Sequence, residues 1–165
     1  MRTLIPNILT PDLADELSRI CPNKSNTIWD RPEINELIEK IFLLSGTQGK
    51  PLLEKPSYWR VEKKHECGHK WHYDGCKEQN GKLTKNHMPW CTHTCSILLS
   101  DPATYGGGTF KFKDPDEEYR EEHYLSAVFF TSHAENEPQL HMVERYFGPR
   151  TALLMFLKVL DEPQT

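Results

Sequence analysis

Four residues of this chain have types and spacings that suit metal and anion chemistry. His72 and Asp74 stand two positions apart, and on an extended segment such residues point to the same side. A second histidine, His141, and then Arg150 follow much later in the chain. Two imidazoles and one carboxylate on one face of a metal ion leave other coordination positions open, which suits Fe(II) and O₂ chemistry. A closed structural zinc site instead fills every position with protein ligands.

Further motifs follow the His72-x-Asp74 pair in a set order. Residues 105–112 read as a Gly-Gly turn with its following strand, and 125–130 as a strand before the last histidine. His141-Met142-Val143 comes next, and Gly148-x-Arg150 lies nine residues after His141. This ordered set resembles the 2-oxoglutarate- and Fe(II)-dependent dioxygenases, in particular their prolyl 4-hydroxylase-like branch, over about residues 58–160. His133 competes as the third ligand, but its spacing fits that branch poorly, so we expect it in a loop.

The resemblance implies both a fold and an activity. The fold is mainly β with N-terminal helices, a double-stranded β-helix of the jelly-roll, cupin-like kind. His72, Asp74 and His141 would bind Fe(II) as the catalytic centre, and Arg150 would bind the C5 carboxylate of the co-substrate 2-oxoglutarate through its planar fork. With O₂, such an enzyme hydroxylates its substrate and releases succinate and CO₂. The implied substrate is a prolyl or other residue of a peptide or protein.

The chain departs from that branch at two places. Many relatives carry a hydroxyl residue two positions after the arginine, where this sequence has Ala152. Relatives often have a tyrosine on the central strand that contacts 2-oxoglutarate, whereas residues 97–99 here are Ile-Leu-Leu. Thr94 or Tyr58 could substitute for it. Three aromatic residues could line the mouth of the site, although aromatics near strands are more often core: Trp71, Trp90 and Tyr105.

Two helices and a series of strands must position these residues. One helix is predicted from its N-cap Thr10 until Cys21-Pro22-Asn23, and a second from Asp30 to Gly46. After Pro56 no helix of convincing length is expected. Short runs rich in β-branched and aromatic residues predict strands there: Tyr58–Val61, Thr94–Leu99, Thr109–Phe112, Leu125–Phe130, Met142–Phe147 and Thr151–Leu160. Residues 75–90 and the acidic segment 114–123 are expected as loops that select the substrate.

Length and charge limit the alternatives. The 165 residues predict one domain, with 1–50 as helical support and 56–160 as the β core. The early Leu4-Ile5 run is broken by Pro6, which favours a soluble, cytoplasmic protein without a signal peptide or membrane span. The net charge of −4 argues against a nucleic-acid substrate. The oligomeric state and the exact substrate, including a small metabolite, stay open.

A different class of function also remains. A zinc-binding module without enzymatic activity could use a cluster of cysteines and histidines instead. Only Cys91 and Cys95 have knuckle-like spacing, and five cysteines do not suggest a disulfide framework. The candidate zinc ligands are Cys67, His69, Cys76, Cys91, His93 and Cys95.

Overall fold

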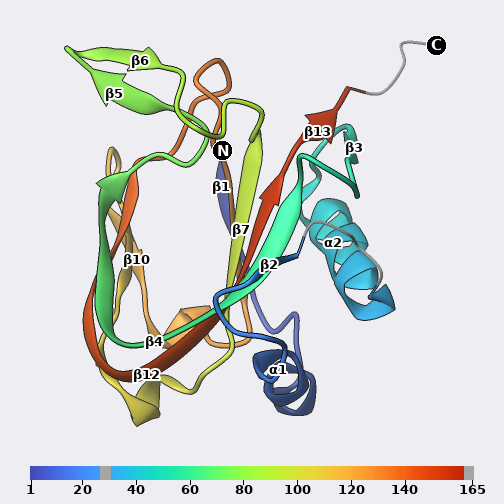
Figure 1. Ribbon diagram of the computed structural model, residues 1–165, viewed down its shortest axis with the longest axis vertical. Coiled ribbons are helices and arrows are strands. Elements are labelled where there is room, and N and C mark those ends of the chain that lie inside the picture. Colours follow the sequence, from blue (N-terminus) through green and yellow to red (C-terminus); the bar gives the residue numbers. More distant parts are fainter. Residues whose placement is uncertain (27–30, 162–165) are drawn as a thin grey trace.

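Two long, curved strands dominate the fold. The computed structural model describes residues 1–26 and 31–161. Strand β4 (Tyr58–His72) pairs antiparallel with β12 (His141–Leu157) from His141↔His72 to Phe156↔Tyr58. Both strands bend together into a U, so that each contributes to two facing layers (Figure 1). The space between the two arms of the U holds the candidate site described below.

The two layers share β4 and β12. In the first, the strand order is β1-β11-β7-β12-β4-β2, and β7 pairs with the C-terminal half of β12. In the second, β8 and β9 pair with the N-terminal half of β12, and β10 pairs with β9. Two separate two-stranded sheets pair β3 with β13 and β5 with β6, and only the second is a hairpin. The bounds are β1 Arg2–Ile5, β2 Ser25–Asn26, β3 Lys50–Pro51, β5 Lys77–Gln79, β6 Lys82–Thr84, β7 His93–Leu98, β8 Gly106–Gly107, β9 Phe110–Phe112, β10 Glu117–Tyr119, β11 Ala127–Thr131 and β13 Val159–Leu160.

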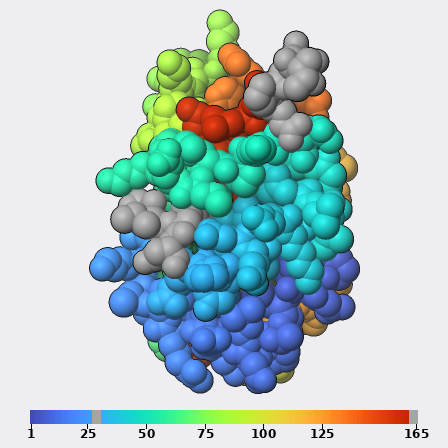
Figure 2. Space-filling model, turned by 90° about the vertical axis from the view of Figure 1, so that its right-hand side faces the viewer, coloured from blue at the N-terminus to red at the C-terminus, as the bar shows by residue number. Residues whose placement is uncertain are grey.

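Two N-terminal helices cover the outer face of the first layer. Helix α1 (Pro11–Ser18) is capped by Thr10, whose Oγ1 accepts from the Leu13 amide at 3.2 Å. Helix α2 (Pro32–Ser45) ends at Gly46, which has a left-handed φ of 68°. Figure 2 shows this N-terminal part of the chain, coloured blue to cyan, spread over that face. Within the described residues no helix is both long and apolar enough to cross a membrane.

Alternation along the first layer separates a core face from a cavity face. Trp59 and Val61 on β4 are buried with the helices, as are Cys95 and Ile97 on β7. Their neighbours point the other way, so the polar Thr94 and Ser96 line the space inside the U. Successive side chains of a strand face opposite sides, which explains why a fully buried strand such as β7 still carries hydroxyl residues. The larger hydrophobic core therefore lies between helices and sheet. A second apolar cluster, which includes Phe110, Phe130 and Val143, lies inside the U beside the polar side chains of the cavity.

The predicted mainly β architecture with N-terminal helices is confirmed, but several boundaries are wrong. The two strands expected at 142–147 and 151–160 are one strand, because the chain passes Gly148-Pro149 through a bulge, with a register shift between Phe147 and Arg150 and a φ of 98° at Gly148. The run expected at 58–61 extends to His72. The acidic segment expected as a loop contains β10 and a 3₁₀ turn at Glu121–His123; a second turn spans Pro102–Thr104.

The helix boundaries also differ from expectation. Helix α1 ends at Ser18, earlier than its apolar spacing through Ile20 suggests, since the Arg19 and Ile20 amides close tighter turns on Glu16 and Leu17. Helix α2 is observed from Pro32, and its predicted start at Asp30 lies outside the described residues. Both helices keep their predicted apolar stripes in the core.

Two buried histidines make stability depend on pH. Burial, helped by the chain's amino-terminal charge, lowers the pKa of His93 to about 4, and burial with the Arg150 charge lowers the pKa of His123 to about 3. Both rings stay neutral when folded, whereas an unfolded histidine takes up a proton near pH 6.5. Their contribution to stability is therefore complete above pH 6.5 and falls towards pH 4 by about 1.4 kcal/mol per pH unit for each ring.

Urea unfolding at pH 7, 6 and 5 measures this dependence. His93→Phe keeps a ring beside Phe129, which stacks on His93 at 5.4 Å, and removes the titrating group. We expect its free energy of unfolding to fall less steeply with pH than that of the unaltered protein. The matched control is His65→Phe at an exposed position of β4, which should leave the slope unchanged. Equal slopes for His93→Phe and the unaltered protein would contradict the assignment.

Candidate metal centre and its cavity

His72, Asp74 and His141 meet where the ends of β4 and β12 lie side by side. His72 is the last residue of β4, His141 is the first of β12, and the two pair directly across the strands. Asp74 follows two residues after His72, so its carboxylate faces both imidazoles. One ligand atom from each of the three side chains lies within 4.8 Å of the other two. Within the described residues, this is the one group of three or more such side chains that could hold a metal ion.

Backbone carbonyls fix both histidine rings in the orientation that a metal requires. Nδ1 of His72 lies 2.5 Å from the Lys70 carbonyl oxygen, and Nδ1 of His141 lies 2.8 Å from that of Gln139. A carbonyl only accepts, so each Nδ1 carries a hydrogen, and in the neutral ring Nε2 has the lone pair that a metal would use. The Nε2 atoms point at Asp74, at 3.3 Å for His72 and 3.4 Å for His141. This donor set fits a divalent metal.

The electrostatics of the group favour an ionised carboxylate. Asp74 is buried, and burial alone would raise its pKa, but the His141 and His72 imidazoles hold that pKa well below its usual range. Burial lowers the pKa of His72, but the hydrogen bond to Asp74, the charge of Asp74 and the Lys70 carbonyl together raise that pKa overall. Three groups bound mainly to one another in this way are typical of a site where a cation replaces the shared protons.

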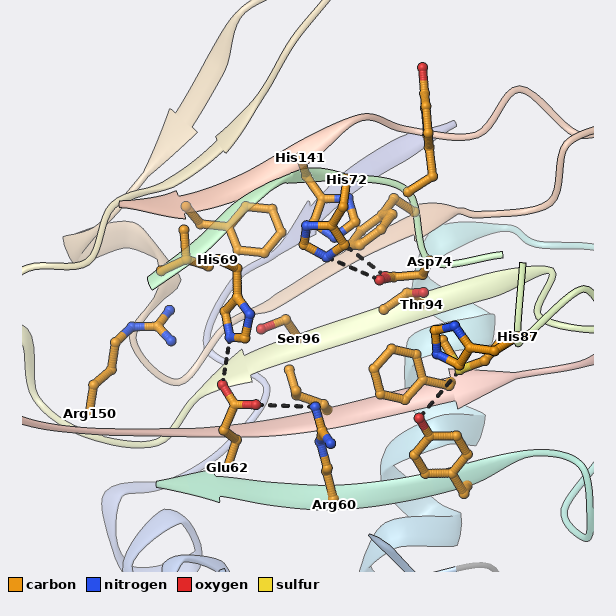
Figure 3. A pocket seen from close by; sticks show the side chains of 18 residues that line it. Arg60, Glu62, His69, His72, Asp74, His87, Thr94, Ser96, His141 and Arg150 are labelled. Atoms are coloured by element: carbon orange, nitrogen blue, oxygen red, sulfur yellow. Dashed lines mark hydrogen bonds and ion pairs between the residues drawn. The ribbon is translucent and has the colours of Figure 1, made fainter. Parts of the chain in front are cut away.

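A cavity of about 250 Å³ opens beside the three residues. Figure 3 shows the imidazoles and Asp74 at one wall, Arg150 at one end, and His87 near the other. Apolar side chains, among them Phe110, Phe130 and Val143, fill much of the remaining wall. Its volume is below the range typical of pockets for drug-sized ligands. The cavity therefore suits a small acid together with one small side chain.

Arg150 closes one end of this cavity and has unused donors. The residue is 4 % exposed, and its Nε and Nη2 atoms have no hydrogen-bond partner. Its guanidinium lies over the Tyr146 ring at 5.4 Å. Gly108 leaves room for it, since a Cβ there would lie 3.3 Å from the Arg150 Cδ, and its φ of 78° suits glycine. A buried guanidinium with free donors is a site for an incoming carboxylate.

A second charged group, not expected from the sequence, lies on the same cavity wall. Glu62 is 4 % exposed, and its carboxylate lies 2.8 Å from His69 Nε2 and 3.2 Å from Arg60 Nη2. Burial raises the pKa of Glu62, but His69, Lys64 and Arg60 together lower it below its usual value. The available signal was the alternation Trp59-Arg60-Val61-Glu62, which places both charges on the inner face of a buried strand.

Asn86 holds the backbone of Asp74 in place, a role that its sequence context did not indicate. Its Nδ2 donates to the Asp74 carbonyl at 2.7 Å and to that of Cys76 at 3.1 Å, while its Oδ1 accepts from the Met88 amide at 2.8 Å. The side chain thus fastens the segment after the β5–β6 hairpin to the backbone of the carboxylate ligand. No local sequence pattern distinguishes this asparagine from an ordinary turn residue.

Replacing Asn86 by alanine should loosen Asp74 and weaken metal binding. Residues that orient metal ligands typically contribute 10- to 100-fold to metal affinity, and we expect a loss of about tenfold or more here. Calorimetric titration with Fe(II) under argon measures the effect. Lys85→Ala, at an exposed neighbouring position, is the matched control and should bind as the unaltered protein does. If Asn86→Ala binds Fe(II) as tightly as the unaltered protein, the hydrogen bonds of Asn86 are not needed to position Asp74.

The structure separates the remaining candidate residues. The His133 backbone pairs with Gly75, the residue after Asp74, and its Nδ1 accepts from the Glu135 amide. The His133 side chain does not line the cavity and does not belong to the group of His72, Asp74 and His141. Tyr58 and Thr94 both line the cavity, as expected of substitutes for the missing tyrosine. The three aromatics differ: Trp71 is 41 % exposed under Lys113, Trp90 packs on Tyr58, and Tyr105 is buried near the Arg150 end.

The cysteines do not form the alternative zinc site in the described part of the chain. All five thiols are free, and none belongs to a cluster of potential metal ligands. Cys91 and Cys95 are fully buried, and burial raises the pKa of Cys91 to about 12. Zinc binds the thiolate, which this environment disfavours.

Comparison with known proteins identifies the fold. No protein-family model matches this sequence, and no curated protein matches it. Solved structures do match. A collagen prolyl hydroxylase of Paramecium Bursaria Chlorella virus-1, solved with 2-oxoglutarate, has a TM-score of 0.67 at 16 % identity, over 97 % of this chain and 96 % of that one. A Pseudomonas putida prolyl-4-hydroxylase has a TM-score of 0.64 at 12 % identity, and the match covers 96 % of this chain and 88 % of that one.

A third similar structure is a 2-oxoglutarate–Fe(II) oxygenase family member from Burkholderia pseudomallei. Its TM-score is 0.60 at 12 % identity, over 95 % of this chain and 84 % of that one. These similarities run through nearly the whole chain. They confirm the predicted jelly-roll fold of the prolyl hydroxylase-like oxygenases.

Proposed function

We propose that this chain is an Fe(II)- and 2-oxoglutarate-dependent dioxygenase that hydroxylates a residue, most simply proline, in a peptide or protein. The observation that carries the proposal is the placement of the His72, Asp74 and His141 ligand atoms within 4.8 Å at one wall of a cavity that ends on Arg150. A metal site with open positions beside a free buried guanidinium suits a co-substrate that chelates a metal and carries a second carboxylate.

Each residue has a distinct task in this proposal. His72, Asp74 and His141 hold Fe(II), and the Lys70 and Gln139 carbonyls keep both Nε2 atoms directed at it. Arg150 binds the C5 carboxylate of 2-oxoglutarate and so sets its orientation in the cavity. With O₂, the bound iron and 2-oxoglutarate supply the oxidising chemistry that hydroxylates a C–H bond and yields succinate and CO₂.

The apolar wall has a chemical task as well. Phe110 and Phe130 pack around the His141 ring, at 5.6 and 4.6 Å between ring centroids. These side chains exclude water from one side of the metal ligands and hold the His141 ring in place. A dry, shaped cavity limits side reactions of a strongly oxidising centre, and it strengthens the attraction between Arg150 and its carboxylate partner.

The substrate proposal rests on size, charge and the similar structures. Two of those structures are named prolyl hydroxylases, one of them acting on collagen. A cavity of about 250 Å³ has room for one amino-acid side chain beside 2-oxoglutarate. The net charge of −4 also disfavours a nucleic-acid substrate. These points support a protein or peptide as the substrate. We propose that residues 1–165 form the single domain that acts on it.

A succinate-release screen tests the proposal. The protein is incubated with Fe(II), 2-oxoglutarate and O₂ against pools of proline-containing peptides, peptides without proline, and small acids. We expect succinate release above the background without substrate for a proline-containing pool, with one oxygen atom gained by the peptide. His72→Ala is the matched negative control. Turnover on small acids alone would replace the proposed substrate class, and no turnover with any pool would count against the activity.

A further inference from the structure

Glu62 and Arg150 occupy positions where an ion pair would be expected. Ala152 pairs with Glu62 across β12 and β4, and Arg150 pairs with Lys64, so Glu62 and Arg150 are diagonal neighbours. Both side chains line the same cavity, and both residues are 4 % exposed. Diagonal positions on one face of an antiparallel pair lie within reach of long side chains. Opposite charges buried this close would normally satisfy each other.

The structure shows a different pairing. The Glu62 carboxylate contacts His69 Nε2 at 2.8 Å, Arg60 Nη2 at 3.2 Å and Lys64 Nζ at 4.0 Å. Within the described residues no ion pair joins Glu62 to Arg150, whose Nε and Nη2 keep no partner. Figure 3 shows His69 reaching down to Glu62 between the metal ligands and the Arg150 end of the cavity. His69 makes the shortest contact to the carboxylate.

We propose that His69 is a positioning residue that holds Glu62 away from Arg150 and thereby keeps the guanidinium free for the co-substrate. The inference rests on the proposed function, because the carboxylate that Arg150 awaits is that of 2-oxoglutarate. Glu62 is a built-in competitor for the same donors, attached to the neighbouring strand. His69, together with Arg60 and Lys64, binds the Glu62 carboxylate and so keeps it from pairing with Arg150.

The position of the Glu62 carboxylate depends on His69 more than on Arg60 and Lys64. The His69 and Arg60 side chains are about equally exposed, at 30 % and 32 %, but His69 Nε2 lies closer to the carboxylate, at 2.8 Å against 3.2 Å. Lys64 is 42 % exposed and its Nζ lies 4.0 Å away, so solvent screens its attraction for Glu62. Without His69, the buried carboxylate would lose its shortest hydrogen bond. The unsatisfied buried donors on the same cavity wall are Nε and Nη2 of Arg150 and Nε of Arg60, whose guanidinium already contacts Glu62. A buried acceptor without a partner is costly, which drives Glu62 to pair with Arg150. Ala152 carries no polar group that could intervene.

A double-mutant cycle on 2-oxoglutarate binding tests this role. Calorimetric titration of the Fe(II)-loaded protein under argon compares the unaltered protein with His69→Ala, Glu62→Gln and the double variant. We expect His69→Ala to weaken 2-oxoglutarate binding by about tenfold or more, and Glu62→Gln to bind within about threefold of the unaltered protein. The double variant should return to the affinity of Glu62→Gln, because the competing charge is gone. His65→Ala, an exposed histidine on the same strand, is the matched control and should change nothing.

The other outcomes overturn the inference. Undiminished binding by His69→Ala would show that Glu62 does not compete. A double variant as weak as His69→Ala would show that His69 contacts the ligand itself or supports the metal centre. If the unaltered Fe(II)-loaded protein binds no 2-oxoglutarate, the proposed function fails and the inference falls with it. The first two results leave the proposed function standing.

Discussion

Replacing His141 by alanine should lower the affinity for Fe(II) by more than about 100-fold and abolish iron-dependent turnover. Loss of a residue that merely orients a ligand typically costs 10- to 100-fold in metal affinity, and loss of the ligand itself costs more. The ring also packs against Phe110 and Phe130, so its removal leaves the remaining two ligands less constrained. Fe(II) titration under argon measures the affinity, and succinate release measures the turnover.

His133→Ala is the matched control for this prediction. Both residues are histidines between β11 and the bulge of β12, but His133 lies outside the cavity and bridges to Gly75. The control should therefore keep most of the metal affinity and turnover. The reverse pattern, with His133→Ala inactive and His141→Ala unaffected, would contradict the ligand assignment.

Arg150→Ala should raise the dissociation constant for 2-oxoglutarate by about 10- to 200-fold. A hydrogen bond to a charged group contributes roughly 1.5–3 kcal/mol, and about 1.4 kcal/mol corresponds to a tenfold change in affinity. Truncation also leaves the carboxylate of the co-substrate without a partner in a confined cavity. Because position 152 is alanine and offers no helping hydroxyl, we expect a loss towards the upper end of this range. Calorimetric titration of the Fe(II)-loaded variants under argon gives the comparison.

Two further measurements separate Arg150 from the metal ligands. A guanidinium only donates, so it cannot coordinate the ion, and Fe(II) affinity without 2-oxoglutarate should change little in Arg150→Ala. Arg150→Lys should be intermediate, since it keeps the charge and loses the fork geometry. Equal 2-oxoglutarate affinities for Arg150→Ala and the unaltered protein would remove Arg150 from the site.

The sequence predicted that His72, Asp74 and His141 come together, because the pattern that indicates it is local and has a direction. His72 and Asp74 share one side of an extended segment, and the motif order placed His141 and Arg150 after them. The spacing also favoured His141 over His133, whose side chain does not belong to the group. The architecture followed from the same motifs together with the apolar stripes of the two helices.

The continuity of β12 and the charged inner wall were not predictable in the same way. Gly148-Pro149 looks like a turn in isolation, but pairing with β4 on one side and with β8 nearby keeps the strand continuous through a bulge. The contact between Glu62 and His69 joins two parts of β4 seven residues apart, and it exists because that strand curves into a U (Figure 1). Curvature of this kind depends on tertiary pairing rather than on local residue preference.

The most direct test of the account is a sequential anaerobic titration of the unaltered protein, first with Fe(II) and then with 2-oxoglutarate. The account predicts one Fe(II) bound per chain, followed by one 2-oxoglutarate that binds the metal-loaded protein far more tightly than the metal-free protein. Tight stoichiometric zinc binding with loss of the fold on chelation, together with no 2-oxoglutarate binding to the Fe(II)-loaded chain, would contradict it and support a structural zinc module.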